Sequence, residues 1–331
     1  MADARDIGKA RGLAVAGRLE AICTSQRKGT PKTAVAAAQL QRDHGIAGDA
    51  HAGPWHRQVS LLAHEHIEAF KLSGRLDLRA GAFAENLVVS GLDLGSLGLG
   101  SRMRVGENAI LSITQLGKKC HHHCAIYDQT GDCIMPRVGL FARVLADGAV
   151  AAGDTATIEH VVERSVFQAV VLTLSDRCAA GTAQDTAGPA VAALLRESLP
   201  AHIYAAEILP DGRANLAERL RHYADGHGID LVVAVGGTGP APRDETPEAV
   251  RDVVERLTPG FDEAMRQASL AVTPLAMLSR ACSGIRGSTL ILSLPGSERA
   301  AVENLRAILP ALPHGLAKLR GDPADCGRPT P

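Results

Sequence analysis

The sequence predicts an α/β protein of two domains: a mostly β, barrel-like domain followed by a doubly wound, mainly parallel α/β domain. Its 331 residues are about twice the usual length of a domain. The first half consists of short apolar runs broken by glycine and polar turns, whereas from Phe167 onward apolar strands alternate with helical segments. We therefore expect one domain at residues 12–160 and the other at residues 166–320.

The first domain is expected to be rich in short strands, at residues 14–22, 59–62, 86–89, 103–105, 109–113 and 141–145. Two turn signals predict hairpins. One lies at Val105–Asn108, and the other is Asp147-Gly148, which is typical of a type I′ turn between two neighbouring strands. Helical periodicity is persuasive only over residues 64–72. This pattern favours a barrel or sandwich.

The second domain is expected to alternate strand and helix. Strands are expected at residues 168–175, 202–210, 229–237 and 288–296, and the first and third have the continuous apolar pattern typical of strands buried on both faces. Helices are expected at 189–199, at 215–223, from Thr246-Pro247 onward, and at 297–309. The short links between these elements predict a parallel sheet with helices on both faces.

The composition excludes several classes of protein. Lys and Arg number 35 against 36 Asp and Glu, and aromatic residues are 3%, so there is no basic surface and few stacking platforms for nucleic acid. No apolar stretch approaches the roughly 20 residues of a membrane span. The charged N-terminus shows no secretory signal, so we expect a cytoplasmic protein that binds neither nucleic acid nor membranes.

A glycine-rich turn follows the third apolar run of the second domain. Gly236, Gly237, Thr238 and Gly239 can converge backbone N–H groups on an anion, and Arg243-Asp244 follow on the same edge. The turn is neither a Walker loop nor a GxGxxG motif. It predicts a phosphate site, although glycine and proline are also what an ordinary strand-to-helix turn requires.

Three other loops leave the same predicted edge. Ser175, Asp176 and Asp185 follow the first strand, Asp211 follows the second, and Pro295, Gly296 and Ser297 follow the fourth. Carboxylates beside a phosphate site are typical ligands of Mg²⁺. The four loops together favour a binding site over four unrelated turns.

These residues carry a family resemblance. LTLSDRCAAGTAQDTAGP, GGTGPAPRDETPEA, TPGFDEAMR, LSRACSGIRGSTLILSLPGS and LPALPHGLAKL resemble, in order and spacing, the molybdopterin adenylyltransferases of molybdenum-cofactor biosynthesis. The resemblance spans about residues 166–320. It implies a trimeric α/β protein that binds molybdopterin and Mg-ATP and forms adenylylated molybdopterin and pyrophosphate.

The resemblance also implies roles for particular residues. Asp211 and Asp244 would be the catalytic carboxylates associated with Mg²⁺, and Gly236 to Gly239 would hold phosphate. Ser175, Asp176, Ser279 and Ser297 would line the pterin pocket, together with the Pro295-Gly296 turn. Glu263 and Arg280 match positions typical of the family and are expected to contribute to cofactor binding. Such a set needs no nucleophilic side chain, because phosphoryl-type transfer depends on positioning and charge neutralisation.

The first domain carries a cluster of thiols, KKCHHHCAIYDQTGDC. Lys118 and Lys119 precede Cys120, and nearby cations favour the thiolate. A zinc site is one interpretation, although the spacing does not match common zinc motifs. An iron–sulfur cluster would need more cysteines at tighter spacing. The two other interpretations of the cluster are a reactive, sulfur-carrying cysteine and a polar loop with exposed histidines.

GDAHAGPWHRQVSLLAHEHI, GAFAENLVVSGLDL, ITQLGKKCHHHCAIY and GDCIMPRVGLFARVLADGAVAAGD resemble a MOSC domain, as found in molybdenum-cofactor sulfurases. The resemblance implies a cysteine that carries sulfur as a persulfide or ligates molybdenum, and it aligns that cysteine with Cys120. Lys119 stands where many members have proline, which leaves Cys124 and Cys133 as alternatives. His51 and His56 are expected near the pocket or, as lone histidines, in structural roles.

The two halves thus point to one pathway, in which the second domain adenylylates molybdopterin and the first handles sulfur or binds the molybdenum cofactor. The alternative is a non-catalytic carrier or sensor of molybdopterin or molybdenum, with a structural zinc or a plain MOSC module. Expected ligands are Mg²⁺, ATP and molybdopterin, with molybdenum at Cys120. Expected partners are further copies of the chain and a molybdenum-insertion protein or molybdoenzyme.

Overall fold

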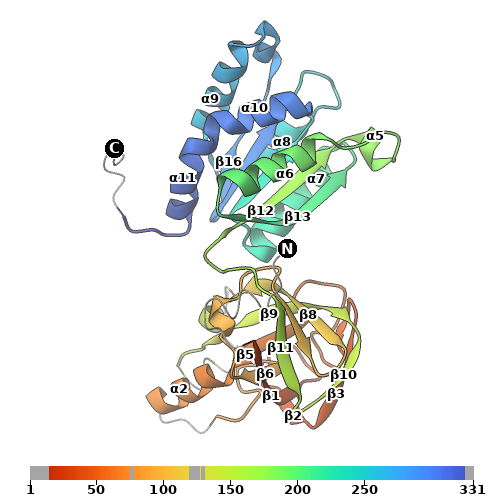
Figure 1. Ribbon diagram of the computed structural model, residues 1–331, viewed down its shortest axis with the longest axis vertical. Coiled ribbons are helices and arrows are strands. Elements are labelled where there is room, and N and C mark those ends of the chain that lie inside the picture. The colour runs from red at the N-terminus through yellow and green to blue at the C-terminus, as the bar shows by residue number, and fades with distance from the viewer. Residues whose placement is uncertain (1–14, 75–77, 119–126, 128–130, 325–331) are drawn as a thin grey trace. The chain divides into compact units, whose positions relative to one another are not determined.

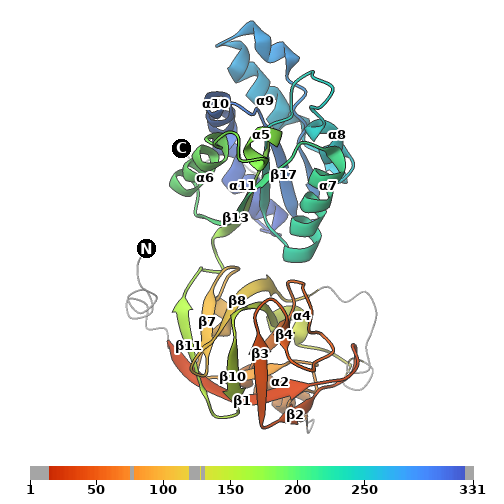
Figure 2. The same ribbon diagram turned by 90° about the vertical axis from the view of Figure 1, so that its right-hand side faces the viewer.

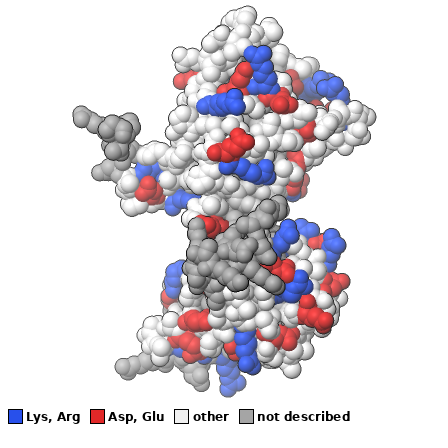
Figure 3. All heavy atoms as spheres, in the orientation of Figure 1, with Lys and Arg blue, Asp and Glu red and all other residues white. Residues whose placement is uncertain are grey.

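The computed structural model describes residues 15–74, 78–118, 127 and 131–324 (Figure 1). The chain divides into two compact units, one ending at Ser165 and the other beginning at Val166. No helix in the described ranges is both long and apolar enough to cross a membrane. On the face shown in Figure 3, acidic and basic side chains are interspersed over each unit, in line with the balanced composition.

The first unit contains a closed β-barrel, as predicted. Its main sheet runs in the order β11-β7-β8-β9-β5-β6-β1-β2, and pairing of β1 with β11 closes the ring and leaves β2 outside it. Neighbours are antiparallel except β5 and β6. The strands are β1 (Ala16–Thr24), β2 (Thr33–Val35), β5 (Val59–Ala63), β6 (Leu87–Ser90), β7 (Arg102–Val105), β8 (Ala109–Leu116), β9 (Leu140–Ala146) and β11 (Thr155–His160).

A smaller sheet and short helices complete this unit. The sheet has the order β10-β3-β4, with β3 at Ala37–Gln41, β4 at Gly45–Ile46 and β10 at Gly148–Ala151. The helices are α2 (His64–Gly74), which was predicted, and α4 (Met135–Val138), with a 3₁₀ turn η1 (Leu94–Ser96). The β7–β8 hairpin is confirmed.

The hairpin expected at Asp147-Gly148 is wrong. The strand β10 that follows this turn pairs with β3 rather than with β9. The Asp147 carboxylate accepts a hydrogen bond from the backbone N–H of Arg42, which ties the turn to the β3–β4 region. Gly148 lies against β8, because a Cβ atom there would be 2.4 Å from the nitrogen of Ala109.

The second unit is a six-stranded sheet in the order β13-β12-β14-β17-β16-β15. Strands β12, β13, β14 and β17 are parallel to one another. At one edge, β16 is antiparallel to β17 and β15 is antiparallel to β16. The strands are β12 (Phe167–Leu174), β13 (Ala201–Leu209), β14 (Leu231–Val235), β15 (Arg256–Leu257), β16 (Gly284–Arg286) and β17 (Thr289–Leu294). The predicted doubly wound, mainly parallel architecture is confirmed.

Helices cover both faces of this sheet. Figure 2 shows α6 and α10 on one side and α7 and α8 on the other. Apolar side chains of α6, α9, α10 and α11 form the core against the sheet. The helical elements are α5 (Asp176–Ala179), α6 (Ala187–Ser198), α7 (Arg213–Arg221), α8 (Thr246–Arg251), α9 (Pro259–Leu270), α10 (Glu298–Ile308) and α11 (Leu312–Leu319), with η2 (His222–His227), η3 (Pro274–Leu278) and η4 (Leu309–Ala311).

Candidate active site

The candidate site lies at the carboxyl ends of the parallel strands of the second unit. The chain leaves β12 toward β13 on one side and later enters β14 on the other. Ligands of open α/β sheets bind at this kind of topological switch point, beyond the strand ends. The loops that begin at Ser175 and Gly236 therefore flank the crevice where a ligand is expected.

The glycine turn fits tightly between two strand ends. Gly236 has φ of 114°, and a Cβ atom there would lie 2.5 Å from the carbonyl oxygen of Leu174. Its N–H donates to the carbonyl of Leu294 at 3.0 Å. Gly237 is also left-handed, with φ of 61°. Only glycine accepts these conformations at such close approach, so the turn's sequence is dictated by its geometry.

Asp244 forms hydrogen bonds within the same loop. Its carboxylate Oδ2 accepts from the N–H of Ala241 at 3.1 Å, while its own N–H donates to the carbonyl of Ala241 at 2.9 Å. A Cβ atom on Gly239 would lie 2.8 Å from that carboxylate. Among the described residues, no hydrogen bond involves Oδ1 of Asp244.

Arg280 clamps this loop from the segment before β16. Its Nε donates to the carbonyl of Gly239 at 2.9 Å, its Nη1 donates to Glu248 Oε1 at 2.6 Å, and its Nη2 donates to the carbonyl of Asp244. The backbone N–H of Arg280 also donates to the carbonyl of Thr238 at 2.9 Å. Burial raises the pKa of Glu248, but the hydrogen bond from Arg280, a backbone hydrogen bond and the charges of Arg280 and Arg251 together outweigh burial and lower the pKa overall. The guanidinium therefore holds the loop of residues 236–244 in shape.

Two carboxylates meet across the neighbouring strand ends. The N–H of Asp211 donates to Asp176 Oδ1 at 3.0 Å, and the N–H of Asp176 lies 3.4 Å from Asp211 Oδ2. Ser175 caps the short helix α5, because its hydroxyl accepts from the N–H of Cys178 at 3.3 Å. The structure thus brings together the loops after β12 and β13, while no hydrogen bond among the described residues links Asp244 to this pair.

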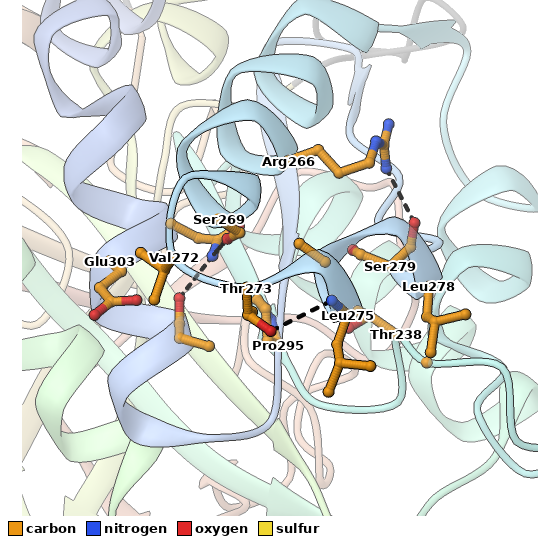
Figure 4. Close-up of a pocket in the computed structure, with 14 residues that line it drawn as sticks. Thr238, Arg266, Ser269, Val272, Thr273, Leu275, Leu278, Ser279, Pro295 and Glu303 are labelled. Carbon is orange, nitrogen blue, oxygen red and sulfur yellow. Dashed lines mark hydrogen bonds between the residues drawn. The ribbon is translucent and has the colours of Figure 1, made fainter.

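A pocket of about 260 Å³ opens beside the glycine turn (Figure 4). Four predicted residues line it: Thr238, Gly239, Ser279 and Pro295. Ser175, Asp176, Asp211 and Asp244 do not line it, so the carboxylates form a separate region of the rim. Ser297 is the N-cap residue of α10, and Gly296 lies close to Gly236. Glu263 is exposed on α9 and does not line the pocket.

The pocket's other wall was not predicted. It comes from α9, η3 and α10, and its polar members include Arg266, Ser269, Thr273 and Asn304. Arg266 Nη1 donates to the carbonyl of Ser279 at 3.1 Å, and Asn304 Nδ2 donates to the hydroxyl of Ser269 at 2.8 Å. These side chains are far apart in the sequence and form no local motif, so only the folded chain reveals them.

The rim carboxylates suit a hard cation that phosphate also binds. In the described part of the chain, no three His, Cys, Asp or Glu side chains are grouped as a metal site. Mg²⁺ is usually held by one or two carboxylates plus substrate phosphates, so Asp211 and Asp244 are compatible with it without forming a complete cage.

The thiol cluster of the first unit is only partly visible. Cys120 and Cys124 lie outside the described residues. Cys133 is 7% exposed and packs in an apolar cluster with Ile67 and Phe83. Buried cysteines of this kind behave as small apolar side chains, which disfavours Cys133 as the reactive thiol.

The two histidines expected near the pocket have defined contacts. His56 Nε2 lies 3.0 Å from Oε1 of Gln115, the glutamine that begins the motif leading to Cys120. His51 Nδ1 lies 3.1 Å from Nζ of Lys32, and Lys32 forms a buried ion pair with Asp49 at 2.5 Å. His56 is thus next to the predicted motif, whereas His51 belongs to a buried charged cluster.

Comparison with known proteins places both units. Residues 170–314 match the family model described as a probable molybdopterin binding domain, and residues 48–157 match the MOSC domain model. Molybdopterin adenylyltransferase of Helicobacter pylori strain 26695 is 42% identical over 154 residues, covering 46% of this chain and 87% of that protein. The chain belongs to the molybdopterin adenylyltransferase family.

A second molybdopterin adenylyltransferase agrees with this assignment, and a solved structure is also similar in sequence. The Escherichia coli K12 protein of that name is 39% identical over 139 residues, which cover 42% of this chain and 71% of the relative. Among solved structures, the molybdopterin biosynthesis enzyme MoaB of Thermus thermophilus is 45% identical, with a match that covers 48% of this chain and 100% of that one and a TM-score of 0.46. The resemblances to the adenylyltransferase family and to the MOSC domain are both confirmed.

Proposed function

We propose that residues 166–320 form a molybdopterin adenylyltransferase domain, which transfers AMP from ATP to molybdopterin. The observation that carries this proposal is the Gly236–Gly239 turn at the switch point of the sheet, with Asp244 on the same loop. Family membership supplies the reaction. An oxygen of the pterin's terminal phosphate would attack the α-phosphorus of ATP, and the bond to the bridging oxygen would break to release pyrophosphate.

Each region of the rim has a role in this proposal. The backbone N–H groups of Gly236 to Gly239 would hold phosphate oxygens, and Arg280 would keep that loop in place. Ser175, Asp176, Ser279 and Ser297 would contact the pterin. Asp211 and Asp244 would hold Mg²⁺, which when bound neutralises charge on the phosphates. No side chain needs to act as a nucleophile.

Pyrophosphate release tests this function. Purified full-length protein should release pyrophosphate only when ATP, Mg²⁺ and molybdopterin are all present. Asp244→Asn should abolish release and keep the fold, while Asp252→Asn, which alters an exposed ion pair with Arg213, should leave it intact. Unchanged turnover in Asp244→Asn would refute the assignment. Molybdopterin binding by the wild type without pyrophosphate release would establish the carrier or sensor instead.

We further propose that residues 12–160 form a MOSC domain whose Cys120 carries sulfur as a persulfide or ligates molybdenum. The contact of His56 with Gln115 supports this, because it fixes the start of the segment that leads to Cys120. Persulfide trapping and molybdenum analysis should give a signal that Cys120→Ser removes and Cys133→Ser keeps. Stoichiometric zinc with no signal dependent on Cys120 would favour the structural zinc module.

We also propose that the chain is a homotrimer in the cytoplasm that delivers its product to a molybdenum-insertion protein or molybdoenzyme. Exposed apolar side chains in and beside η3 support self-association: Leu270, Val272, Leu275, Met277 and Leu278. Such side chains on one segment are typical of a contact surface. Sedimentation equilibrium of the full chain should give three times the monomer mass, and a monomer would refute this point.

A further inference from the structure

The end of helix α7 carries a local irregularity that the proposed reaction does not use. At Arg221 the helix passes directly into a π-helical segment, His222–His227. Gly228, with φ of 66°, ends this segment and donates its N–H to the carbonyl of Tyr223. The π geometry inserts extra residues into a turn, so residues five apart share a face. His222 and His227 are five residues apart.

The two imidazoles converge. Their Nε2 atoms are 3.1 Å apart, and the ring centroids are 4.7 Å apart with the planes inclined by 65°. Two imidazoles that pointed straight at each other across that gap would have more widely separated centroids. At least one ring is therefore inclined to the line between the nitrogens. Two nitrogens bound to one tetrahedral Zn²⁺ at about 2.05 Å each lie about 3.3 Å apart, close to the observed separation.

We propose that His222 and His227 form a binding site for a divalent transition-metal ion such as Zn²⁺. Imidazole is a preferred ligand of Zn²⁺, Cu²⁺ and Ni²⁺. Helical histidine pairs at i and i+4 are a common chelating arrangement, and the π segment produces the same arrangement at i and i+5. In the described part of the chain no third ligand of the His, Cys, Asp or Glu types joins the pair, so water completes the coordination.

The surroundings orient the His227 ring and hold the π segment in place. Nδ1 of His227 lies 3.2 Å from the hydroxyl of Tyr204, while Nε2 of the same ring faces Nε2 of His222. A hydrogen bond at the second nitrogen is typical of histidines that bind metals. Asp225, within the π segment, forms a bidentate ion pair with Arg286 at 2.8 and 2.7 Å. His227 is 6% exposed, while His222 is partly exposed and gives the ion access from solvent.

Neighbouring charges do not oppose a cation. The nearest cations along the helix are Arg221 and Arg219. Arg221 donates from Nη2 to the backbone carbonyl of Asp252, and Arg219 is paired with the carboxylate of Glu207 through both Nε and Nη2. The site also lies away from the glycine turn, because η2 precedes the amino end of β14 and the turn follows its carboxyl end. Loss of the metal site should therefore leave adenylyl transfer unchanged, which separates this proposal from the proposed function.

Calorimetric titration of metal-free full-length protein with Zn²⁺ tests the site. The titration is done in a Cys120→Ser/Cys124→Ser background, which removes the thiols as competing ligands. His222→Ala/His227→Ala should lose one equivalent of bound Zn²⁺, and Tyr204→Phe should bind it roughly 10- to 100-fold more weakly. His314→Ala, at an exposed histidine of α11, is the matched control and should bind as the background does. Equal stoichiometry and affinity in background and double variant would overturn the proposal.

A second measurement needs no variant. Wild-type crystals soaked in Zn²⁺ should show an anomalous peak about 2.0–2.1 Å from the Nε2 atoms of both His222 and His227. Such a peak would support the site even if the double alanine variant failed to fold. Saturating Zn²⁺ without a peak between these atoms would overturn it.

Discussion

Replacing Arg280 by lysine tests whether the loop of residues 236–244, which we propose binds phosphate, must be held rigid for turnover. Arg280 bonds to two backbone carbonyls of the loop and to Glu248, and lysine can keep about one of these links. A hydrogen bond to a charged group contributes roughly 1.5–3 kcal/mol, and partial exposure of both side chains, 38% and 30%, reduces that value. We expect a loss of about 2 kcal/mol, or roughly 30-fold in kcat/KM for ATP.

The barrel offers a closely matched control. Arg104 pairs with Glu159 at the same side-chain exposures, 38% and 30%, and also donates to a backbone carbonyl, that of Glu107. Arg104→Lys should lower Tm to a similar degree without changing kcat/KM. If Arg280→Lys kept kcat/KM within threefold of the wild type, or if both variants lost activity equally, the positioning role of Arg280 would be refuted.

Three further predictions concern the loop, its pH dependence and the barrel. Gly236→Ala should lower both Tm and turnover, because its Cβ atom would meet the carbonyl of Leu174, while Gly181→Ala, also left-handed but with nothing within 4 Å, should cost far less. The pKa of Glu248 lies below its ordinary value of 4.5 in the folded state, so its pairing stabilises the fold above that pH and is lost as pH falls through the lowered value. The Tm difference between wild type and Glu248→Gln should thus be constant above pH 4.5 and should shrink as the pH falls below that value. Asp49→Asn should reduce the free energy of unfolding, measured by chemical denaturation, by about 3–5 kcal/mol, because it leaves the buried charge of Lys32 uncompensated. The double variant Lys32→Met/Asp49→Leu should lose less free energy of unfolding than Asp49→Asn. A larger loss in the double variant would contradict this reasoning.

The parallel strands could be predicted because burial on both faces leaves a local signature. Every residue of β14 and β17 is buried; β14 appears in the sequence as an unbroken apolar run, and β17 as a mainly apolar run that includes Thr289 and Ser293. Helix α9 has no such signature. It starts with Pro259-Gly260, and only Asp262 and Met265 are buried. Its position depends on contacts with α10, which the local pattern does not contain.

Short edge elements and long-range pairings explain the remaining errors. Strands β15 and β16 have two and three residues, too few for any periodicity to show. The Asp147-Gly148 signal marked the break between β9 and β10 but not the partner of β10, which lies about a hundred residues earlier in β3.

The site was predictable where one loop supplies the chemistry and not where several elements converge. Gly236 to Gly239 stand together in the sequence, and glycine at the first two positions permits the left-handed conformations of Gly236 and Gly237. The link between Arg280 and Glu248 spans 32 residues, so only the fold shows the arginine bound to the loop. In the Asp262-Glu263 pair, the buried Asp262 bonds to Ser283, and burial raises its pKa. Sequence similarity alone had drawn attention to the exposed Glu263 instead.

Closure of the barrel also constrains the order in which the chain can fold during synthesis. The closing pair joins residues 16–18 of β1 to residues 155–157 of β11. Contacts between residues so distant in sequence form slowly, and strand edges remain open until they do. On the ribosome, β1 can therefore pair with β11 only after nearly the whole first unit has emerged. The second unit, which begins at Val166, follows directly in the sequence. A nascent chain that stops short of β11 would expose the edges of β1 and β7, so chaperone binding should be strongest just before residue 155.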